Sequence, residues 1–205
     1  MKKIISMAGA AFVAALAMSA PAQASVLENF QIKLGVSGVL PNESGSPVDV
    51  EISDEWVPSL QVEYFFSDNI SAELLCCIAT HDVATASGLD LGEVTHFPPT
   101  LTVKYRWTDF GQFQPYVGAG VNYTAFIDDE QPPGVDVDYD ESVGGALQVG
   151  FDYRLDDHWA LNLDARRIWI STDATVTLAG APPTVINNDV DIDPWVVSAS
   201  VGYRF

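Results

Sequence analysis

Basic residues are few in this chain: 9 Lys and Arg stand against 28 Asp and Glu, which gives a formal net charge of −19 at pH 7. Proteins that bind nucleic acid neutralise phosphates with basic surface, so this deficit excludes nucleic acid as a partner. Intrinsic disorder is excluded too, because 48% of the residues are apolar and acidic disordered segments lack apolar residues. The chain therefore has to bury a large apolar surface or expose it to lipid.

Cysteine is also scarce, and the only two cysteines, Cys76 and Cys77, are adjacent. Neighbouring residues of a β-strand point to opposite faces, so a disulfide between them would be strained. We expect two free thiols that pack as small hydrophobic side chains rather than redox groups or metal ligands.

Long hydrophobic runs are confined to the start of the chain. Lys2 and Lys3 precede an apolar stretch over residues 4–18, and Ala22-Gln23-Ala24 follows with small residues. This order predicts that residues 1–24 are a secretory signal peptide, cleaved after Ala24. Beyond Ala24 no apolar run approaches the roughly 18 to 20 residues of a membrane-spanning helix. The exported domain, residues 25–205, is then either a soluble protein or a β-barrel.

Apolar and polar residues alternate with a period of two throughout this domain. In the first segment, Leu34 and Val36 lie on one face and Lys33 and Gly35 on the other. Each alternating segment has about ten residues, the length that a tilted strand needs to cross a bilayer. Eight such segments are found, at residues 30–40, 56–66, 70–80, 97–107, 113–126, 143–155, 159–170 and 195–205.

Aromatic residues distinguish a membrane barrel from a soluble one. Apolar and polar residues also alternate in a soluble sandwich or a lipocalin-like barrel, but there the apolar face points inward and the outer face carries charge. Here the aromatic residues on the apolar faces form two rings around an aliphatic band, as in outer-membrane barrels. One ring comprises Tyr64, Phe66, Tyr105, Trp107, Phe113, Phe151, Tyr153, Trp159, Tyr203 and Phe205, and the other Trp56, Tyr123, Trp169 and Trp195.

The connections between segments alternate in length. Three are short, and four are long, at residues 41–55, 81–96, 127–142 and 171–194. Short periplasmic turns and long extracellular loops are typical of bacterial outer-membrane barrels. We therefore predict an all-β fold, an eight-stranded antiparallel transmembrane β-barrel in the outer membrane, with both termini in the periplasm and surrounded by lipid and lipopolysaccharide.

Several short motifs, taken together and in order, resemble those of the OmpW family of small outer-membrane proteins. The motifs are His96-Phe97-Pro98-Pro99-Thr100-Leu101, Pro115-Tyr116-Val117-Gly118-Ala119-Gly120, Asn122-Tyr123-Thr124, Gly150-Phe151-Asp152-Tyr153, Ile192-Asp193-Pro194-Trp195 and Gly202-Tyr203-Arg204-Phe205. The resemblance covers essentially the whole exported domain. It implies an eight-stranded barrel that passes small hydrophobic molecules across the outer membrane. We expect no cofactor.

Charged residues on the inward faces predict a polar floor in the lumen. An eight-stranded barrel is barely wide enough for its side chains, and an unpaired buried charge is costly, so these residues should form ion pairs. They fall at the lower and middle levels of the barrel: Lys33, Glu63, Glu73, Lys104, Arg106, Asp152, Arg154, Asp164, Arg166 and Arg204. Outward residues are almost all uncharged; Arg167 is the exception in its segment and is expected at the upper interface, where it can reach lipid phosphates.

Inward residues of the upper level are apolar, which predicts a hydrophobic funnel open to the outside. They are Val39, Val57, Leu75, Cys77, Phe126, Ile168 and Ile170, with Ala79 beside them. A hydrophobic solute would gain by burial there, but the charged floor would favour a sideways exit into lipid. Because proline cannot donate to a strand ladder, Pro98 and Pro99 are candidates for a lateral gap. Simple packing of the barrel, and prolines that only end a loop, remain open alternatives.

Other chemistry finds less support. Asp136, Asp138 and Asp140 have the opening spacing of a calcium loop, but Glu141 stands where an EF-hand needs glycine, so an EF-hand is excluded. A looser binding of divalent cations by the acidic loops stays open, as does a metal held between His81 and His96. We predict no bound metal, and no enzyme, because no serine is placed beside either histidine.

Two further expectations concern partners. The final strand ends in Tyr203 and Phe205 on its outward face, which resembles the signal read by the machinery that inserts outer-membrane barrels. An alternative function is a non-transporting surface barrel whose acidic loops act in adhesion or as a receptor. A plugged lumen would favour that alternative, and a cavity in the upper lumen would favour transport.

Overall fold

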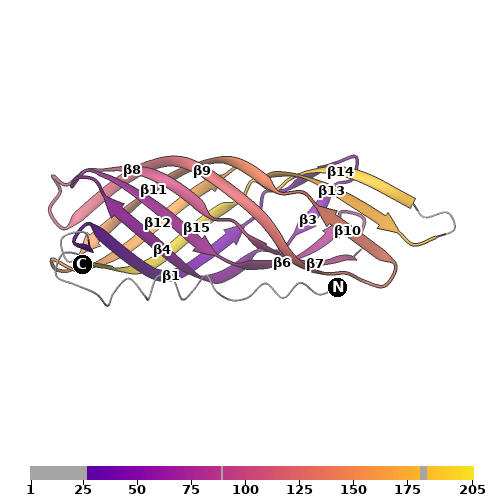
Figure 1. The fold of residues 1–205 in the computed structure, drawn as a ribbon, viewed down its shortest axis with the longest axis horizontal. Helices are drawn as coiled ribbons and strands as arrows, with labels where there is room; N and C mark the ends of the chain where they lie inside the picture. Colours follow the sequence, from indigo (N-terminus) through magenta and orange to yellow (C-terminus); the bar gives the residue numbers. More distant parts are fainter. Residues whose placement is uncertain (1–26, 89, 181–183) are drawn as a thin grey trace.

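Eight strands of the chain close into an antiparallel barrel. Figure 1 views this barrel from the side. The computed structural model describes residues 27–205 except 89 and 181–183, so the predicted signal peptide lies outside the described residues. Neighbouring strands follow one another around the barrel, and the last pairs with the first. The predicted fold class is therefore confirmed. In order around the barrel the strands are β1 (Phe30–Leu40), β4 (Glu55–Phe65), β5 (Ile70–Cys77), β8 (Thr100–Arg106), β9 (Phe113–Glu130), β11 (Ser142–Arg154), β12 (Trp159–Ile168) and β15 (Trp195–Arg204).

The outer face of the barrel is apolar. Leu34, Val103 and Val149 are 64%, 55% and 55% exposed, which is favourable only if lipid surrounds them. At the end that carries the short turns and the C-terminus, here called the lower end, aromatic rings touch one another. The centroids of Trp159 and Tyr203, for example, are 4.9 Å apart. Among the described residues, no helix is long and apolar enough to cross a membrane.

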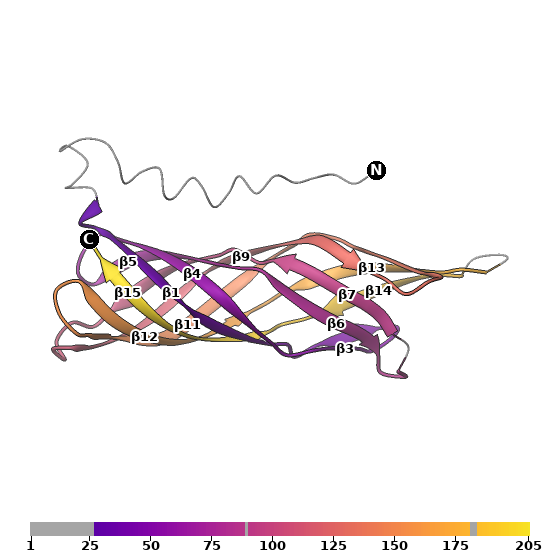
Figure 2. The ribbon, with the colours of Figure 1, turned by 90° about the horizontal axis from the view of Figure 1, so that it is seen from below.

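The segments predicted as long loops continue as strands, so that prediction was wrong. These strands form an extension above the upper end of the barrel, at the right of Figures 1 and 2. Their outward residues are mostly polar, as Asp173 and Thr175 are, with Val185 as an exposed exception, and apolar residues such as Ala174 and Val176 face inward. Such segments look like solvated loops in a sequence. Within the described residues they are β2 (Ser44–Ser46), β3 (Val50–Ile52), β6 (Ala79–Thr85), β7 (Asp90–Phe97), β10 (Val135–Tyr139), β13 (Ser171–Leu178) and β14 (Thr184–Asp191).

The wall of the barrel is interrupted where β5 and β8 continue upward as β6 and β7. The β5–β8 pairing ends at Leu75 with Thr100. The β6–β7 pairing resumes, in the same register, at Ala79 with His96. Between these two pairs the described residues show no strand pairing on this side, and Pro98-Pro99 occupies one edge of the interruption. Proline has no N–H group to complete the ladder.

A third proline borders the same interruption from its other side. The β4–β5 pairing ends at Ser59 with Cys77, and its register would next place Pro58 opposite Ile78. Ile78 itself belongs to no strand and separates β5 from β6. The chain around Ile78 is therefore flanked by proline on both sides, with no ladder pairing recorded at Ile78 among the described residues.

A second junction, where β12 and β15 meet the extension, is closed by side chains instead. The Arg167 guanidinium donates to the backbone carbonyl and the carboxylate of Asp193, with Nη2 3.3 Å from Oδ2. The Ile170 N–H donates to the same carboxylate at 3.1 Å. Arg167 was expected to extend toward lipid phosphates; it is instead paired within the protein, because Asp193 supplies a nearer anion.

Candidate functional site in the barrel lumen

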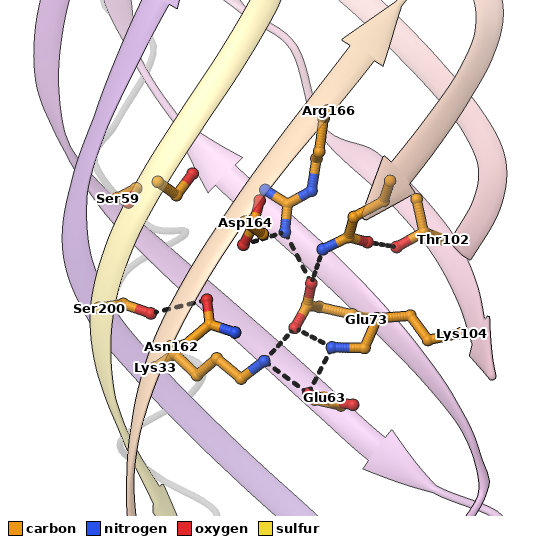
Figure 3. A network of polar contacts seen from close by, with 12 residues as sticks. Lys33, Ser59, Glu63, Glu73, Thr102, Lys104, Asn162, Asp164, Arg166 and Ser200 are labelled. Atoms are coloured by element: carbon orange, nitrogen blue, oxygen red, sulfur yellow. Dashed lines mark hydrogen bonds and ion pairs between the residues drawn. The ribbon is translucent and has the colours of Figure 1, made fainter. Parts of the chain in front are cut away.

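Eight charged side chains in the middle of the lumen form one ionic network, drawn in part in Figure 3. Every member is at least 95% shielded from solvent. Four are basic and four acidic, so the network carries no formal net charge. This pairing is what burial requires, since a charge without a partner would be strongly destabilising in so narrow a space. The members are Lys33, Glu63, Glu73, Lys104, Arg106, Asp152, Asp164 and Arg166.

Glu73 is the centre of this ionic network. Its carboxylate accepts hydrogen bonds from Lys33 at 2.6 Å, from Lys104 at 2.7 Å and from Arg166 at 2.7 Å. The side-chain amide of Gln148 donates a fourth at 2.9 Å. Figure 3 shows Glu73 between Arg166 on one side and the two lysines on the other. Glu73 thus joins strands from opposite walls of the barrel and blocks the lumen.

An aromatic ring that the sequence analysis did not single out as a lumen residue completes the blockage. Tyr116 is 1% exposed, and the Lys104 ammonium lies 4.2 Å from its ring centroid. Its hydroxyl accepts a hydrogen bond from Asn162 at 2.8 Å. The lack of a side chain at Gly150 makes room for it, since a Cβ there would lie 2.7 Å from the Tyr116 hydroxyl. The sequence could have predicted this position, because Tyr116 alternates with outward residues on its strand and therefore faces the lumen.

Two of the ten residues predicted for the floor lie apart from the ionic network. Arg154 is partly exposed and pairs with Asp157 at 3.5 Å beside a lower turn. Arg204 packs its guanidinium 4.1 Å from the ring centroid of Phe65. Both line a cavity of about 30 Å³ at the lower mouth of the barrel. Both side chains face the lumen, as the sequence predicted. They lie too low in the barrel, however, to reach the ionic network.

Directly above the ionic network, the lumen is lined by apolar side chains. This lower apolar cluster includes six of the seven residues predicted for the funnel. Leu75, Ile168 and Ile170 are each 1% exposed. The cluster consists of Val39, Val57, Leu75, Cys77, Ala79, Ala146, Ile168, Ile170 and Val196.

The seventh predicted residue, Phe126, lies one level higher, in the extension. There it borders an upper apolar cluster made of Val50, Val83, Leu91, Val94, Val137, Ala174, Val176 and Val190. This upper apolar cluster surrounds a cavity of about 60 Å³ whose lining is almost entirely apolar. Ile192 packs against both clusters and makes the apolar lining continuous from the extension down to the ionic network.

A pair of stacked histidines lies at the boundary between the two apolar clusters. The rings of His81 and His96 are 5.0 Å apart and nearly parallel, and Phe126 packs on His96. The pair lies on β6 and β7, above the barrel strands β5 and β8, where the outward residues Thr80, Asp82 and Thr95 are polar. Burial and, to a smaller extent, the adjacent His81 lower the pKa of His96 to about 3. Burial also lowers the pKa of His81, although its hydrogen bond to the Ser53 carbonyl raises that pKa in part.

Acid should therefore loosen the β6–β7 region. Because the pKa of His96 is lower in the folded protein than the ordinary value of about 6.5, its contribution to stability is complete above that value and is lost as the pH falls toward 3. After correction for the intrinsic exchange rate at each pH, the amides of β6 and β7 should be less protected at about pH 4 than at pH 7, while the protection of β12 changes less. His96→Phe should remove most of this difference; an unchanged pH response in that variant would contradict the assignment.

The remaining sequence expectations concern metals and thiols. Cys76 and Cys77 are free thiols, as predicted. Asp136, Asp138 and Asp140 are all exposed on or beside β10. In the described part of the chain, no group of three His, Cys, Asp or Glu side chains gathers as metal ligands.

A closed eight-stranded barrel with a lipid-facing apolar belt defines a bacterial outer-membrane protein. The model of the OmpW family matches residues 27–205, and the chain belongs to this non-enzymatic family. Outer membrane protein W of Vibrio cholerae serotype O1 is 36% identical over 215 residues, which cover 96% of this chain and 97% of that protein.

Solved structures agree with this assignment. The crystal structure of the outer membrane protein OprG from Pseudomonas aeruginosa has a TM-score of 0.78 and 29% sequence identity, over 86% of this chain and 95% of that chain. The solid-state NMR structure of outer membrane protein AlkL in DMPC lipid bilayers has a TM-score of 0.65 and 27% identity, over 86% and 89% of the two chains. The barrel thus has a lipid environment.

Proposed function

We propose that this protein admits small hydrophobic molecules at its upper end and releases them sideways into the outer membrane. The continuous apolar lining above a closed ionic network is the observation that carries the proposal. A hydrophobic solute gains about 25 cal/mol for each Å² of apolar surface that it buries along this path. Its apolar part gains nothing by entering the ionic network, whose four basic and four acidic groups already balance in charge. Straight passage to the lower end is therefore disfavoured.

The same proposal fixes an orientation in the membrane. The short turns and the C-terminus belong at the periplasmic side, and the extension belongs outside the cell, as in other outer-membrane barrels. The acidic outer surface of the extension fits this orientation, because it carries solvated carboxylates. Hydrophobic solutes then reach the cavity of the upper apolar cluster first.

The interruption near Pro98-Pro99 is the proposed exit. Its edge residues Leu75, Cys77 and Ala79 belong to the lower apolar cluster, so the solute path and the unpaired wall meet at one place. The other junction, at Arg167 and Asp193, is held by hydrogen bonds and offers no such opening. Leaving through an unpaired stretch of wall breaks no ladder hydrogen bond.

Restoring the missing donor should close the exit. In the double variant Pro98→Ala/Pro99→Ala, the backbone N–H at position 98 becomes available to the opposite edge at Cys77, while position 99 faces β9, where its carbonyl already accepts from the Tyr123 N–H. We expect uptake of a hydrophobic fluorescent tracer, by cells that carry the full-length protein, to fall several-fold below the wild-type rate. Pro115→Ala changes a proline elsewhere in the wall, on β9, and should leave uptake unchanged.

The background in this measurement is uptake by cells without the protein. Wild-type uptake that does not exceed this background would contradict transport and favour the alternative of a surface barrel for adhesion or reception. If wild-type uptake exceeds the background but the double proline variant takes up tracer at the same rate, the transport proposal would stand and the proposed exit would be wrong.

A further inference from the structure

Five polar atoms at the top of the ionic network have no hydrogen-bond partner among the described residues. They are Nε2 and Oε1 of Gln61, Nε and Nη1 of Arg166, and Oδ1 of Asp164. The three side chains are at least 97% shielded from solvent. A sixth unpartnered atom is Nε of Arg106, in the same ionic network. Buried polar atoms of folded proteins almost always have partners, so unpartnered atoms on three lumen side chains point to a ligand.

These orphan atoms lie where polar and apolar levels of the lumen meet. Gln61 is paired across strands with Leu75, a member of the lower apolar cluster. Arg166 is likewise opposite Val196, and Ile168 follows it on the same face of β12. The carboxylate of Glu73, which binds Arg166, is on the residue diagonal to Gln61 on the next strand. A molecule in the lower apolar cluster would therefore meet these atoms with its inner end.

The orphan atoms specify what that inner end must be. Gln61 and Arg166 can donate, and Asp164 Oδ1 and Gln61 Oε1 can accept. A group that both donates and accepts satisfies them best. The charges also matter, because the four bases and four acids of the ionic network already balance. An ionised carboxylate would add a charge without a partner, which is costly at a buried site.

We propose that Gln61, Asp164 and Arg166 form a binding site for the hydroxyl head of an amphipathic molecule, such as an alkyl alcohol, whose apolar tail occupies the lower apolar cluster. This inference rests on the proposed function and narrows its solutes to molecules with one uncharged polar end. The hydroxyl donates to Asp164 and accepts from Arg166, and Gln61 completes the site.

Matched ligands separate this site from simple hydrophobic binding. The full-length protein in lipid nanodiscs is loaded with a fluorescent hydrocarbon tracer, which is then displaced by 1-octanol, octyl methyl ether or octanoate. The ether has a similar tail and can accept but not donate. We expect 1-octanol to displace the tracer at about three- to tenfold lower concentration than the ether, which is the effect of about one net hydrogen bond. Octanoate should be weaker than 1-octanol.

Gln61→Leu tests the site without removing an existing contact, because the Gln61 side chain has no partner to lose. This variant should fold normally and lose most of the preference for 1-octanol over the ether. Gln31→Leu, an inward glutamine below the ionic network, should keep the preference. Equal displacement by alcohol and ether, or an unchanged preference in Gln61→Leu, would mean that water alone serves these atoms and would overturn the inference. A tracer that fails to bind the wild type would overturn the proposed function and this inference together.

Discussion

Tracer uptake should fall at least tenfold when Ile170 is replaced by aspartate. Ile170 is 1% exposed within the lower apolar cluster, so the new carboxylate would lie without a partner on the proposed solute path. A hydrophobic solute would have to displace the water around that charge, at a cost of several kcal/mol. Ile168 is a less suitable position, because the unpartnered nitrogens of Arg166 lie two residues away and can pair with an aspartate there.

Two controls separate this effect from misfolding or from surface charge. Ile170→Val keeps the path apolar and should take up tracer at nearly the wild-type rate. Val185→Asp places the same charge on an exposed position of β14, where it should have no effect. Folded yield is compared by heat-modifiable migration in gels. A well-folded Ile170→Asp protein with wild-type uptake would show that the lower apolar cluster is packing rather than a path.

Unfolding should respond most strongly to the loss of the Glu73 charge. Glu73→Gln keeps the size of the side chain but leaves Lys33, Lys104 and Arg166 without their shared anion. Breaking a buried ionic network by removing one partner typically costs about 3 to 5 kcal/mol. We therefore expect the variant to unfold in lipid vesicles at a clearly lower denaturant concentration than the wild type.

The matched control is the exposed ion pair near the lower turn. Asp157→Asn removes the partner of Arg154, but the Asp157 side chain is 98% exposed, so water screens the loss. Its unfolding midpoint should equal that of the wild type. If Glu73→Gln also unfolds at the wild-type midpoint, the ionic network contributes no net stability and serves only to block the lumen.

The sequence by itself determined the eight barrel strands and the side of the wall that each residue faces. This was predictable because the direction of a strand side chain is a local property with a period of two, visible in Lys33 against Leu34. Such alternation also showed that Glu73 and Arg166 point inward. The extension escaped prediction because its outward residues are acidic and hydroxylic, which makes β13 look like a loop.

Only the tertiary structure decided which inward residues meet. Glu73 and Arg166 are 93 positions apart in the sequence and come into contact across the lumen because the barrel closes. Height within the barrel depends on the stagger between strands, which alternation does not encode. For that reason Arg204 was predicted in the ionic network yet lies at the lower mouth, and Phe126 lies above its predicted level. The stagger also sets Pro58 beside Ile78 and leaves Gln61 without a partner.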